Sequence, residues 1–321
     1  MKKEIIHIVL CFDSGFVMPS GVMMYSVCVN NKEEKIVFHA IIDESVSVVE
    51  KRNLTEMIAQ FNQKRLEFYE VSSKLTENLP FFHRATITRS TYYRLFLTEI
   101  LPKTISKVLY IDGDCIVRHS LYSLWNIDLD GFALAAAFDV FEAHIEYYNR
   151  LRYPYELGYF NAGVLLINLE YWRSQNLINE YAEYYNNYPD RIKFEDQDVL
   201  NVVLKDKKKF FPIKYNFQSF FLNNDYKWDF WKHEAEYIDA LRDPVIVHYT
   251  SVFKPWNAYI REHHPFSSTF YKYQGQTIWK NMRLEKRSIK LKIKNALADY
   301  LRFMKLKKPL NNFFIDIPPI D

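Results

Sequence analysis

Two aspartates whose carboxylates could bind a metal ion directly follow a short apolar run. Asp112 and Asp114 follow residues 108–111, and Gly113 leaves room between them on the turn. Paired carboxylates are the oxygen ligands that Mg²⁺ or Mn²⁺ takes beside the phosphate oxygens of a substrate. An isolated pair with this spacing is more often a solvated turn, so the pair needs partners before it indicates a metal site.

A second apolar run supplies candidate partners. His248 follows residues 245–247, and Lys254 comes six residues later. An imidazole can complete a carboxylate site and shift its preference toward Mn²⁺, while a lysine can meet a phosphate as a point charge. The alternative is a structural histidine at the end of a strand.

Further polar side chains flank other apolar runs. Each of them also has an ordinary structural interpretation, because aspartate and asparagine favour turns and polar residues cap helices. These candidates are Asp13 after residues 6–12, Asp139 after residues 134–138, Asn161 before residues 164–169, and Asp196, Gln197 and Asp198 ahead of the helical pattern at 199–204.

The elements that must position these side chains alternate along the chain. Buried strands are predicted at 6–12, 37–42, 66–71, 108–111, 134–138 and 164–169, with helices around 54–61, 91–101 and 171–185. This alternation predicts an α/β fold with a mostly parallel sheet, helices on both faces, and a ligand site at the carboxyl ends of the strands. With only seven glycines and no glycine-rich phosphate motif, phosphate binding would have to use other groups.

In this order and spacing, the motifs resemble those of glycosyltransferase family 8, which includes bacterial lipopolysaccharide galactosyl- and glucosyltransferases. The resemblance covers roughly residues 5–260 and includes 90–95, 107–114, 159–169, 196–198, 248–249 and 254–256. It implies a GT-A type, Rossmann-like fold and a retaining hexosyltransferase. The expected donor is UDP-glucose or UDP-galactose, the cofactor is Mn²⁺ or Mg²⁺, and the acceptor is a saccharide or glycolipid of lipopolysaccharide or another surface glycan.

The resemblance also implies roles for individual residues. Its metal ligands are Asp112, Asp114 and His248; its donor-binding residues are Asp13, Arg94, Asp112, Gly113, Asp114, Asn161, Ala162 and Lys254; its catalytic residues are Gln197, Asp196 and Asp139. An amide is a poor covalent nucleophile. We therefore expect the acceptor hydroxyl to attack on the face that the diphosphate leaves, with a diphosphate oxygen accepting its proton.

Composition adds a C-terminal tail to this domain. Residues 1–275 are predicted to form the catalytic domain, and residues 276–321 a basic amphipathic helical tail, because ten basic residues stand against two acidic ones between 281 and 310. Such a tail suits an anionic membrane surface, or else packs on the body as a solvated helix. A net charge of +3 argues against nucleic acid as a partner.

The three cysteines have neither disulfide-framework nor zinc-site spacing, which favours a reducing compartment, and no apolar run is long enough to span a membrane. We therefore expect a cytoplasmic protein, peripheral on the inner face of the membrane. Two other functions stay open at this point. Residues 109–117 also resemble the nucleophile strand of haloacid-dehalogenase phosphatases, and a non-catalytic carbohydrate-binding relative would keep the fold without the reaction.

Overall fold

The computed structural model describes residues 4–77, 79, 88–140, 144–223, 233–250, 252, 254–257 and 264–282, together with 297, 300 and 304. The described residues form a large sheet of seven strands in the order β3-β2-β1-β4-β7-β6-β8. These strands are β1 (Ile5–Phe12), β2 (Lys35–Ile42), β3 (Lys64–Glu70), β4 (Lys107–Ile111), β6 (Leu134–Phe138), β7 (Phe160–Asn168) and β8 (Lys208–Phe210). The mostly parallel sheet predicted from the sequence is therefore confirmed.

One strand runs against the others. β7 pairs antiparallel with both β4 and β6, whereas the remaining pairs are parallel. Reversal places the first residues of β7, Phe160 to Gly163, at the edge where β1 and β4 end. A parallel β7 would carry Asn161 at the opposite edge.

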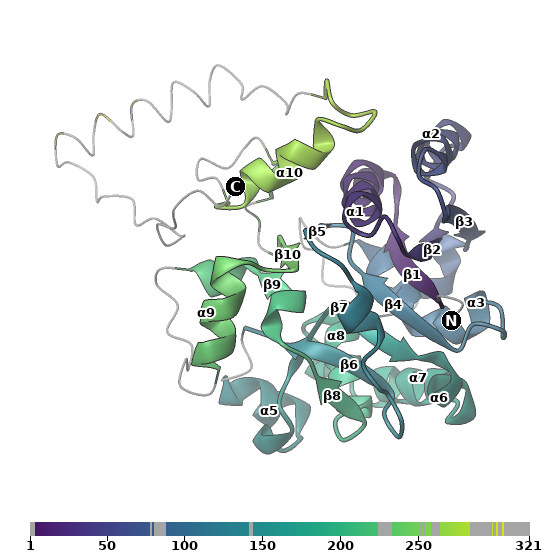
Figure 1. Cartoon of the computed structure of the whole chain (residues 1–321). Helices are drawn as coiled ribbons and strands as arrows, with labels where there is room; N and C mark the ends of the chain where they lie inside the picture. Colours follow the sequence, from purple (N-terminus) through teal and green to yellow (C-terminus); the bar gives the residue numbers. More distant parts are fainter. Residues whose placement is uncertain are drawn as a thin grey trace.

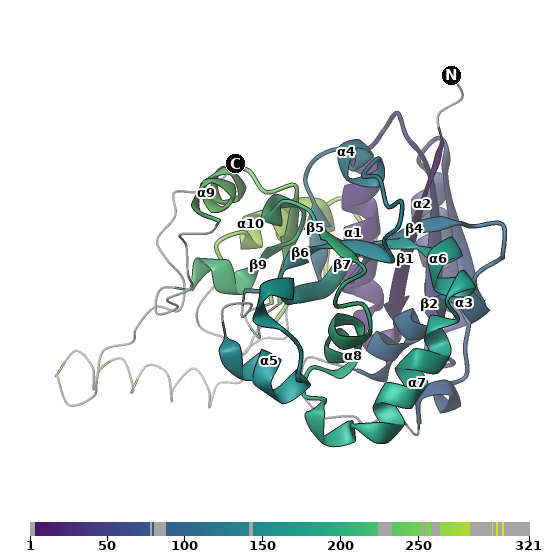
Figure 2. The ribbon, with the colours of Figure 1, turned by 90° about the horizontal axis from the view of Figure 1, so that it is seen from below.

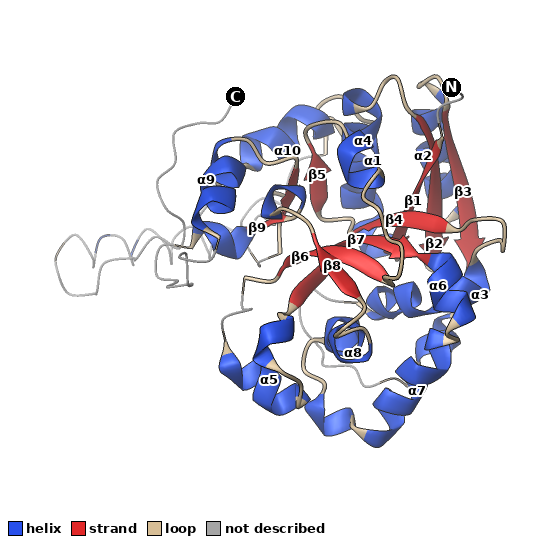
Figure 3. Cartoon of the chain, turned by 60° about the horizontal axis from the view of Figure 1, so that its bottom comes forward, coloured by secondary structure: helices blue, strands red, loops and turns tan. Residues whose placement is uncertain are grey.

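Helices cover both faces of the sheet, as Figure 3 shows. Alternate residues of β1 point into two separate apolar clusters, with Leu10 in one and Val9 in the other. α1 (Val17–Asn30) and α2 (Val48–Ala59) contribute to the first cluster, and α6 (Leu169–Ser174), α7 (Leu177–Asn187) and α8 (Glu195–Val203) to the second. The shorter or peripheral helices are α3 (Leu97–Ile100), α4 (Tyr122–Trp125), α5 (Ile145–Leu151), α9 (Glu234–Arg242) and α10 (Ser267–Gln274).

Two helical predictions need correction. Residues 91–101 form a 3₁₀ helix, Arg89–Phe96, followed by the short α3, and the Thr91 carbonyl accepts a hydrogen bond from Arg94 Nε at 3.0 Å. Residues 171–185 divide into α6 and α7 because Asn176 adopts the left-handed conformation, with φ 51°, which asparagine tolerates.

A second, smaller sheet joins distant parts of the chain. Its strands are β5 (Cys115–Val117), β10 (Ile246–His248) and β9 (Phe217–Gln218), in the order β5-β10-β9. β10 pairs antiparallel with β5, so His248 lies opposite Cys115. This sheet lies on the side of α9 and α10, away from β2 and β3 (Figure 2).

The segment from α10 onward packs on α1. α10 lies beside α1 (Figure 1), and Asn30 Nδ2 donates to the Tyr273 hydroxyl at 2.7 Å. Trp279 fills the space above Gly21, where an added Cβ would lie 2.2 Å from the indole. The basic tail predicted beyond this point falls almost wholly outside the described residues, and within the described part no helix has the length and hydropathy needed to span a bilayer.

Candidate active site

A cavity of about 460 Å³ lies at the sheet edge where β1 and β4 end and β7 begins. The family resemblance gives a role to twelve residues, and eleven of them line the cavity: Arg94, Asp112, Gly113, Asp114, Asp139, Asn161, Ala162, Asp196, Gln197, His248 and Lys254. The twelfth, Asp13, is not among the lining residues. Its carboxylate accepts a hydrogen bond from the Gly15 amide at 2.9 Å and caps the 3₁₀ helix that follows β1.

Asp112 is held by three groups. Its Oδ1 accepts hydrogen bonds from Arg94 Nη2 at 2.8 Å and from the Tyr110 hydroxyl at 2.7 Å, and its amide donates to the Gly163 carbonyl at 2.8 Å. Its other oxygen, Oδ2, lies 3.8 Å from His248 Nε2. One oxygen of Asp112 is therefore engaged by the protein and the other faces the histidine.

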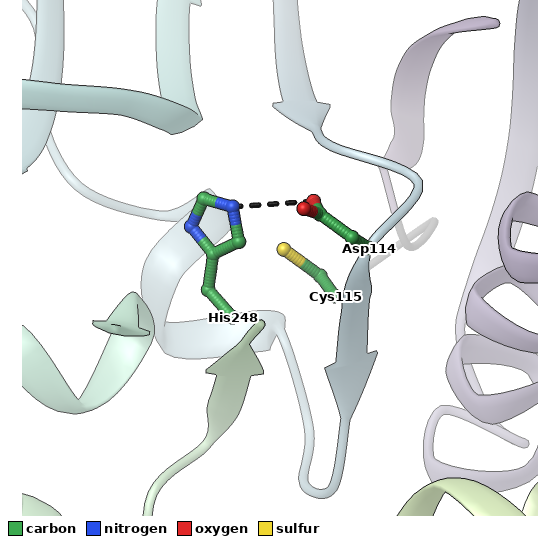
Figure 4. Close-up of side chains that lie close together, drawn as sticks. All are labelled: Asp114, Cys115 and His248. Atoms are coloured by element: carbon green, nitrogen blue, oxygen red, sulfur yellow. Dashed lines mark ion pairs between the residues drawn. The ribbon is translucent and has the colours of Figure 1, made fainter. Parts of the chain in front are cut away.

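Asp114 lies between two basic side chains. Its Oδ1 is 3.2 Å from His248 Nε2, and its Oδ2 forms an ion pair with Lys254 Nζ. Burial alone would raise the pKa of Asp114, but Lys254 and His248 outweigh it and hold the pKa well below its usual range. The carboxylate is therefore ionised, and Figure 4 shows it directed at the imidazole.

Glycine at two positions makes this arrangement possible. An added Cβ on Gly163 would lie 2.1 Å from His248 Cε1 and 2.9 Å from Asp112 Oδ2. On Gly113 it would lie 2.3 Å from Ser20 Oγ of α1. Gly113 thus makes room for a helix packed behind the turn, and not simply for the two carboxylates as the sequence suggested.

Arg94 connects Asp112 to Asp196 of α8. Its Nη1 donates to the Ala162 carbonyl at 2.5 Å, and its Nε lies 3.0 Å from Asp196 Oδ2. Burial opposes its charge, but Asp112 and Asp196 raise the pKa of Arg94 above the usual value. The guanidinium is therefore a positive centre held by two carboxylates and a backbone carbonyl.

Asp139, Asn161 and Gln197 form the opposite side of the cavity. Asn161 Nδ2 and Gln197 Nε2 both donate to Asp139 Oδ2, at 3.0 and 3.2 Å. Gln197 Oε1 accepts from the Ala162 amide at 2.9 Å. Burial raises the pKa of the neighbouring Asp196 to about 6, although Arg94 and the Thr91 hydroxyl favour its ionised form.

Asp198 does not belong to the cavity. Its carboxylate accepts two hydrogen bonds from Arg150, at 2.7 and 3.0 Å, and others from the Tyr159 hydroxyl and the Lys193 and Phe194 amides. These contacts fix the start of α8. Asp198 therefore has the structural role that the sequence analysis gave as the alternative to a functional one.

Sequence reasoning missed two residues beside the predicted metal ligands. Cys115 places its thiol with Asp114 and His248 in a group whose ligand atoms all lie within 4.8 Å of one another (Figure 4). Burial and the nearby aspartates raise its pKa well above the ordinary value, so the thiol is neutral. Asn216 contacts the back of the imidazole, with Oδ1 2.8 Å from His248 Nδ1. No motif marks either residue.

Comparisons with known proteins agree with this geometry. A family model described as glycosyl transferase family 8 matches residues 7–259. General stress protein A of Bacillus subtilis is 28% identical over 281 residues, covering 87% of this chain and 96% of that protein. A lipopolysaccharide 1,3-galactosyltransferase of Salmonella typhimurium is 29% identical over 279 residues, covering 85% of this chain and 78% of that protein.

Among solved structures, the galactosyltransferase LgtC, in complex with donor and acceptor sugar analogs, superimposes with a TM-score of 0.75 at 26% identity. The match covers 87% of this chain and 100% of LgtC. The expected GT-A fold is thereby confirmed.

Proposed function

The chain belongs to glycosyltransferase family 8, and on that premise we propose that its cavity transfers glucose or galactose from a UDP-sugar to a saccharide or glycolipid acceptor. One observation carries the proposal. Ionisable groups suited to a diphosphate gather on one side of the cavity, and a carboxylate with two amides suited to sugar hydroxyls lies on the other.

The residues on the diphosphate side fit a divalent cation. Two carboxylates and one imidazole are a donor set for Mn²⁺ or Mg²⁺, and Asp114 Oδ1 and Asp112 Oδ2 lie 3.2 and 3.8 Å from His248 Nε2. Bound there, the cation would supply positive charge that stabilises the diphosphate leaving group.

This chain's own residues would perform the rest of the reaction. Lys254 offers a second positive charge to the diphosphate as the bond to the sugar breaks. Asp139, held by two amide donors, and Asp196 stabilise the positive charge that develops on the sugar ring. Gln197, whose oxygen already accepts the Ala162 amide, has no basicity to activate the acceptor.

The reaction can then proceed without a protein side chain acting as the base. The bond from the anomeric carbon to the diphosphate oxygen breaks, the acceptor oxygen bonds to that carbon on the same face, and the acceptor proton passes to the diphosphate. Configuration is retained. An inverting reaction would instead need a general base on the opposite face.

The test is UDP release from a panel of UDP-sugars with Mn²⁺, run beside phosphate release from phosphomonoesters. Release of UDP from UDP-glucose or UDP-galactose supports the proposal. Phosphate release alone would indicate the phosphatase reaction, and no turnover with either would indicate a non-catalytic carbohydrate-binding protein. Proton NMR of the new anomeric centre should show an α-linked product, and a β-linked product would contradict the mechanism.

Relatives that are named lipopolysaccharide glucosyl- and galactosyltransferases support a proposal for the acceptor and the place of action. A glycolipid acceptor would lie in a membrane, and a basic C-terminal tail would hold the enzyme on the anionic cytoplasmic surface where this acceptor is exposed. The division into a domain at 1–275 and a tail at 276–321 belongs to this proposal, with the first residues of the tail packed on the domain through Trp279.

A further inference from the structure

Asn216 is fully buried behind the predicted metal ligands and connects the two sides of the cavity. Its Oδ1 lies 2.8 Å from His248 Nδ1, and its Nδ2 donates to Asn161 Oδ1 at 2.9 Å. Asn161 in turn donates to Asp139 at 3.0 Å. A continuous row of hydrogen bonds therefore runs from His248 to Asp139.

The direction of every bond in this row is fixed by groups of known polarity. The Gly163 amide can only donate, and it lies 2.9 Å from Asn161 Oδ1, so that atom must be the oxygen. The group of Asn216 that faces this oxygen must then be its NH₂, which leaves the Asn216 oxygen toward His248. Since that oxygen can only accept, Nδ1 of His248 must carry the proton.

A proton on Nδ1 leaves Nε2 of the neutral imidazole with its lone pair. Nε2 is the atom that faces Asp114 Oδ1 at 3.2 Å and Asp112 Oδ2 at 3.8 Å. Without an acceptor at Nδ1, the other tautomer would be favoured, because an Nε2 proton can donate to Asp114. In that tautomer Nε2 has no lone pair for a cation, and the remaining lone pair is on Nδ1, which faces Asn216.

We propose that Asn216 is a positioning residue that selects the cation-binding tautomer of His248 and, through its NH₂ group, holds Asn161 toward Asp139. The proposal rests on the proposed function for its biological meaning. Its structural content can be measured on protein that is not turning over. Partners that orient a metal-binding histidine typically change metal affinity by 10- to 100-fold when removed.

Three variants test it. Asn216→Ala removes both the acceptor for His248 and the donor to Asn161. Asn216→Asp keeps an acceptor for His248 but cannot donate to Asn161. Asn31→Ala is the matched control, since Asn31 is also a buried asparagine with two side-chain hydrogen bonds, to Val27 and Leu121, and is not among the cavity-lining residues.

The first measurement is ¹⁵N NMR of histidine-labelled, EDTA-treated protein at mildly alkaline pH, and the second is Mn²⁺ titration by electron paramagnetic resonance. Wild type, Asn216→Asp and Asn31→Ala should show the Nδ1–H tautomer of His248 and comparable Mn²⁺ affinity. Asn216→Ala should shift toward the Nε2–H tautomer and bind Mn²⁺ about 10- to 100-fold more weakly.

Asn216→Asp provides a separate readout of the Asn161 side. We expect it to keep Mn²⁺ affinity while its kcat with a UDP-sugar falls, a split that general destabilisation would not produce. If Asn216→Ala fails to fold, Asn216→Asp decides: loss of its Nδ1–H signal or of Mn²⁺ affinity overturns the proposal.

Other outcomes also overturn it. Wild-type tautomer and Mn²⁺ affinity in a folded Asn216→Ala would do so, as would an equal loss of affinity in Asn31→Ala. Failure of the proposed function would look different, because the tautomer and Mn²⁺ results would stand while no UDP-sugar reacted.

Discussion

Substitution of Gly163 by alanine should disable the cation site while leaving the ligands themselves in the chain. The added methyl group would lie 2.1 Å from His248 Cε1, 2.7 Å from His248 Nδ1 and 2.9 Å from Asp112 Oδ2. Real methyl groups do not approach so closely, so the imidazole or β7 must move. β7 is held by pairing with β4 and β6, so we expect the imidazole to move.

Inserting a methyl group into a packed interior typically costs about 1–3 kcal/mol. The imidazole would have to overcome this cost to reach the position in which it binds the cation. Because about 1.4 kcal/mol corresponds to a factor of ten, the Mn²⁺ affinity should fall roughly 5- to 150-fold. The assay is Mn²⁺ titration by electron paramagnetic resonance, with thermal unfolding of metal-free protein measured in parallel.

Gly275→Ala is the matched control, because its methyl group would meet only the Tyr271 and Lys272 carbonyls, at 3.2 and 3.8 Å, next to α10. This variant should bind Mn²⁺ as wild type does. Wild-type Mn²⁺ affinity in Gly163→Ala would refute the reasoning, since it would mean that His248 either adapts without cost or is not a ligand.

Three further predictions follow from other parts of the molecule. Asp114→Ala should abolish UDP release, because it removes a carboxylate that faces His248 and Lys254, whereas Asp128→Ala on the exposed surface should leave UDP release unchanged. Burial and the neighbouring His7 lower the pKa of His39 to about 4, so the unfolded chain binds a proton that the folded chain excludes as pH falls from about 6.5 to about 4. The melting temperature of wild type should therefore fall over that range, and that of His39→Gln should fall less. Deleting residues 283–321 should weaken sedimentation with anionic vesicles, since each basic residue contributes about 1 kcal/mol near such a surface; equal sedimentation with and without them would contradict a membrane-binding tail.

The sequence predicted the cavity residues well because most of them stand at strand ends. Asp112 and Asp139 each follow an apolar run, and the end of a strand is a position that local patterning can identify. Local patterning alone could not place Asn161 at the same edge of the sheet, because that placement depends on β7 running antiparallel. Only the family resemblance supplied that placement in advance.

Other features had no local signal. α1 is apolar on nearly all sides because it is buried, so it lacks the amphipathic period that identifies surface helices. Asn216 gains its role from contacts with residues more than 30 positions away. The steric demand at Gly163 likewise arises only when β10 brings His248 against β7. Such properties belong to the tertiary structure.

The indole of Trp279 in the notch above Gly21 bears on how far the chain can be shortened. A protein ending at residue 275 would lose this indole and expose apolar surface on α1. The same helix supports the turn at Asp112–Asp114, because Ser20 packs against Gly113 and Ser26 Oγ accepts a hydrogen bond from the Val117 amide at 3.0 Å. Shortened proteins that end after residue 282 should therefore remain soluble and active, whereas those that end at 275 should aggregate and lose catalytic activity together.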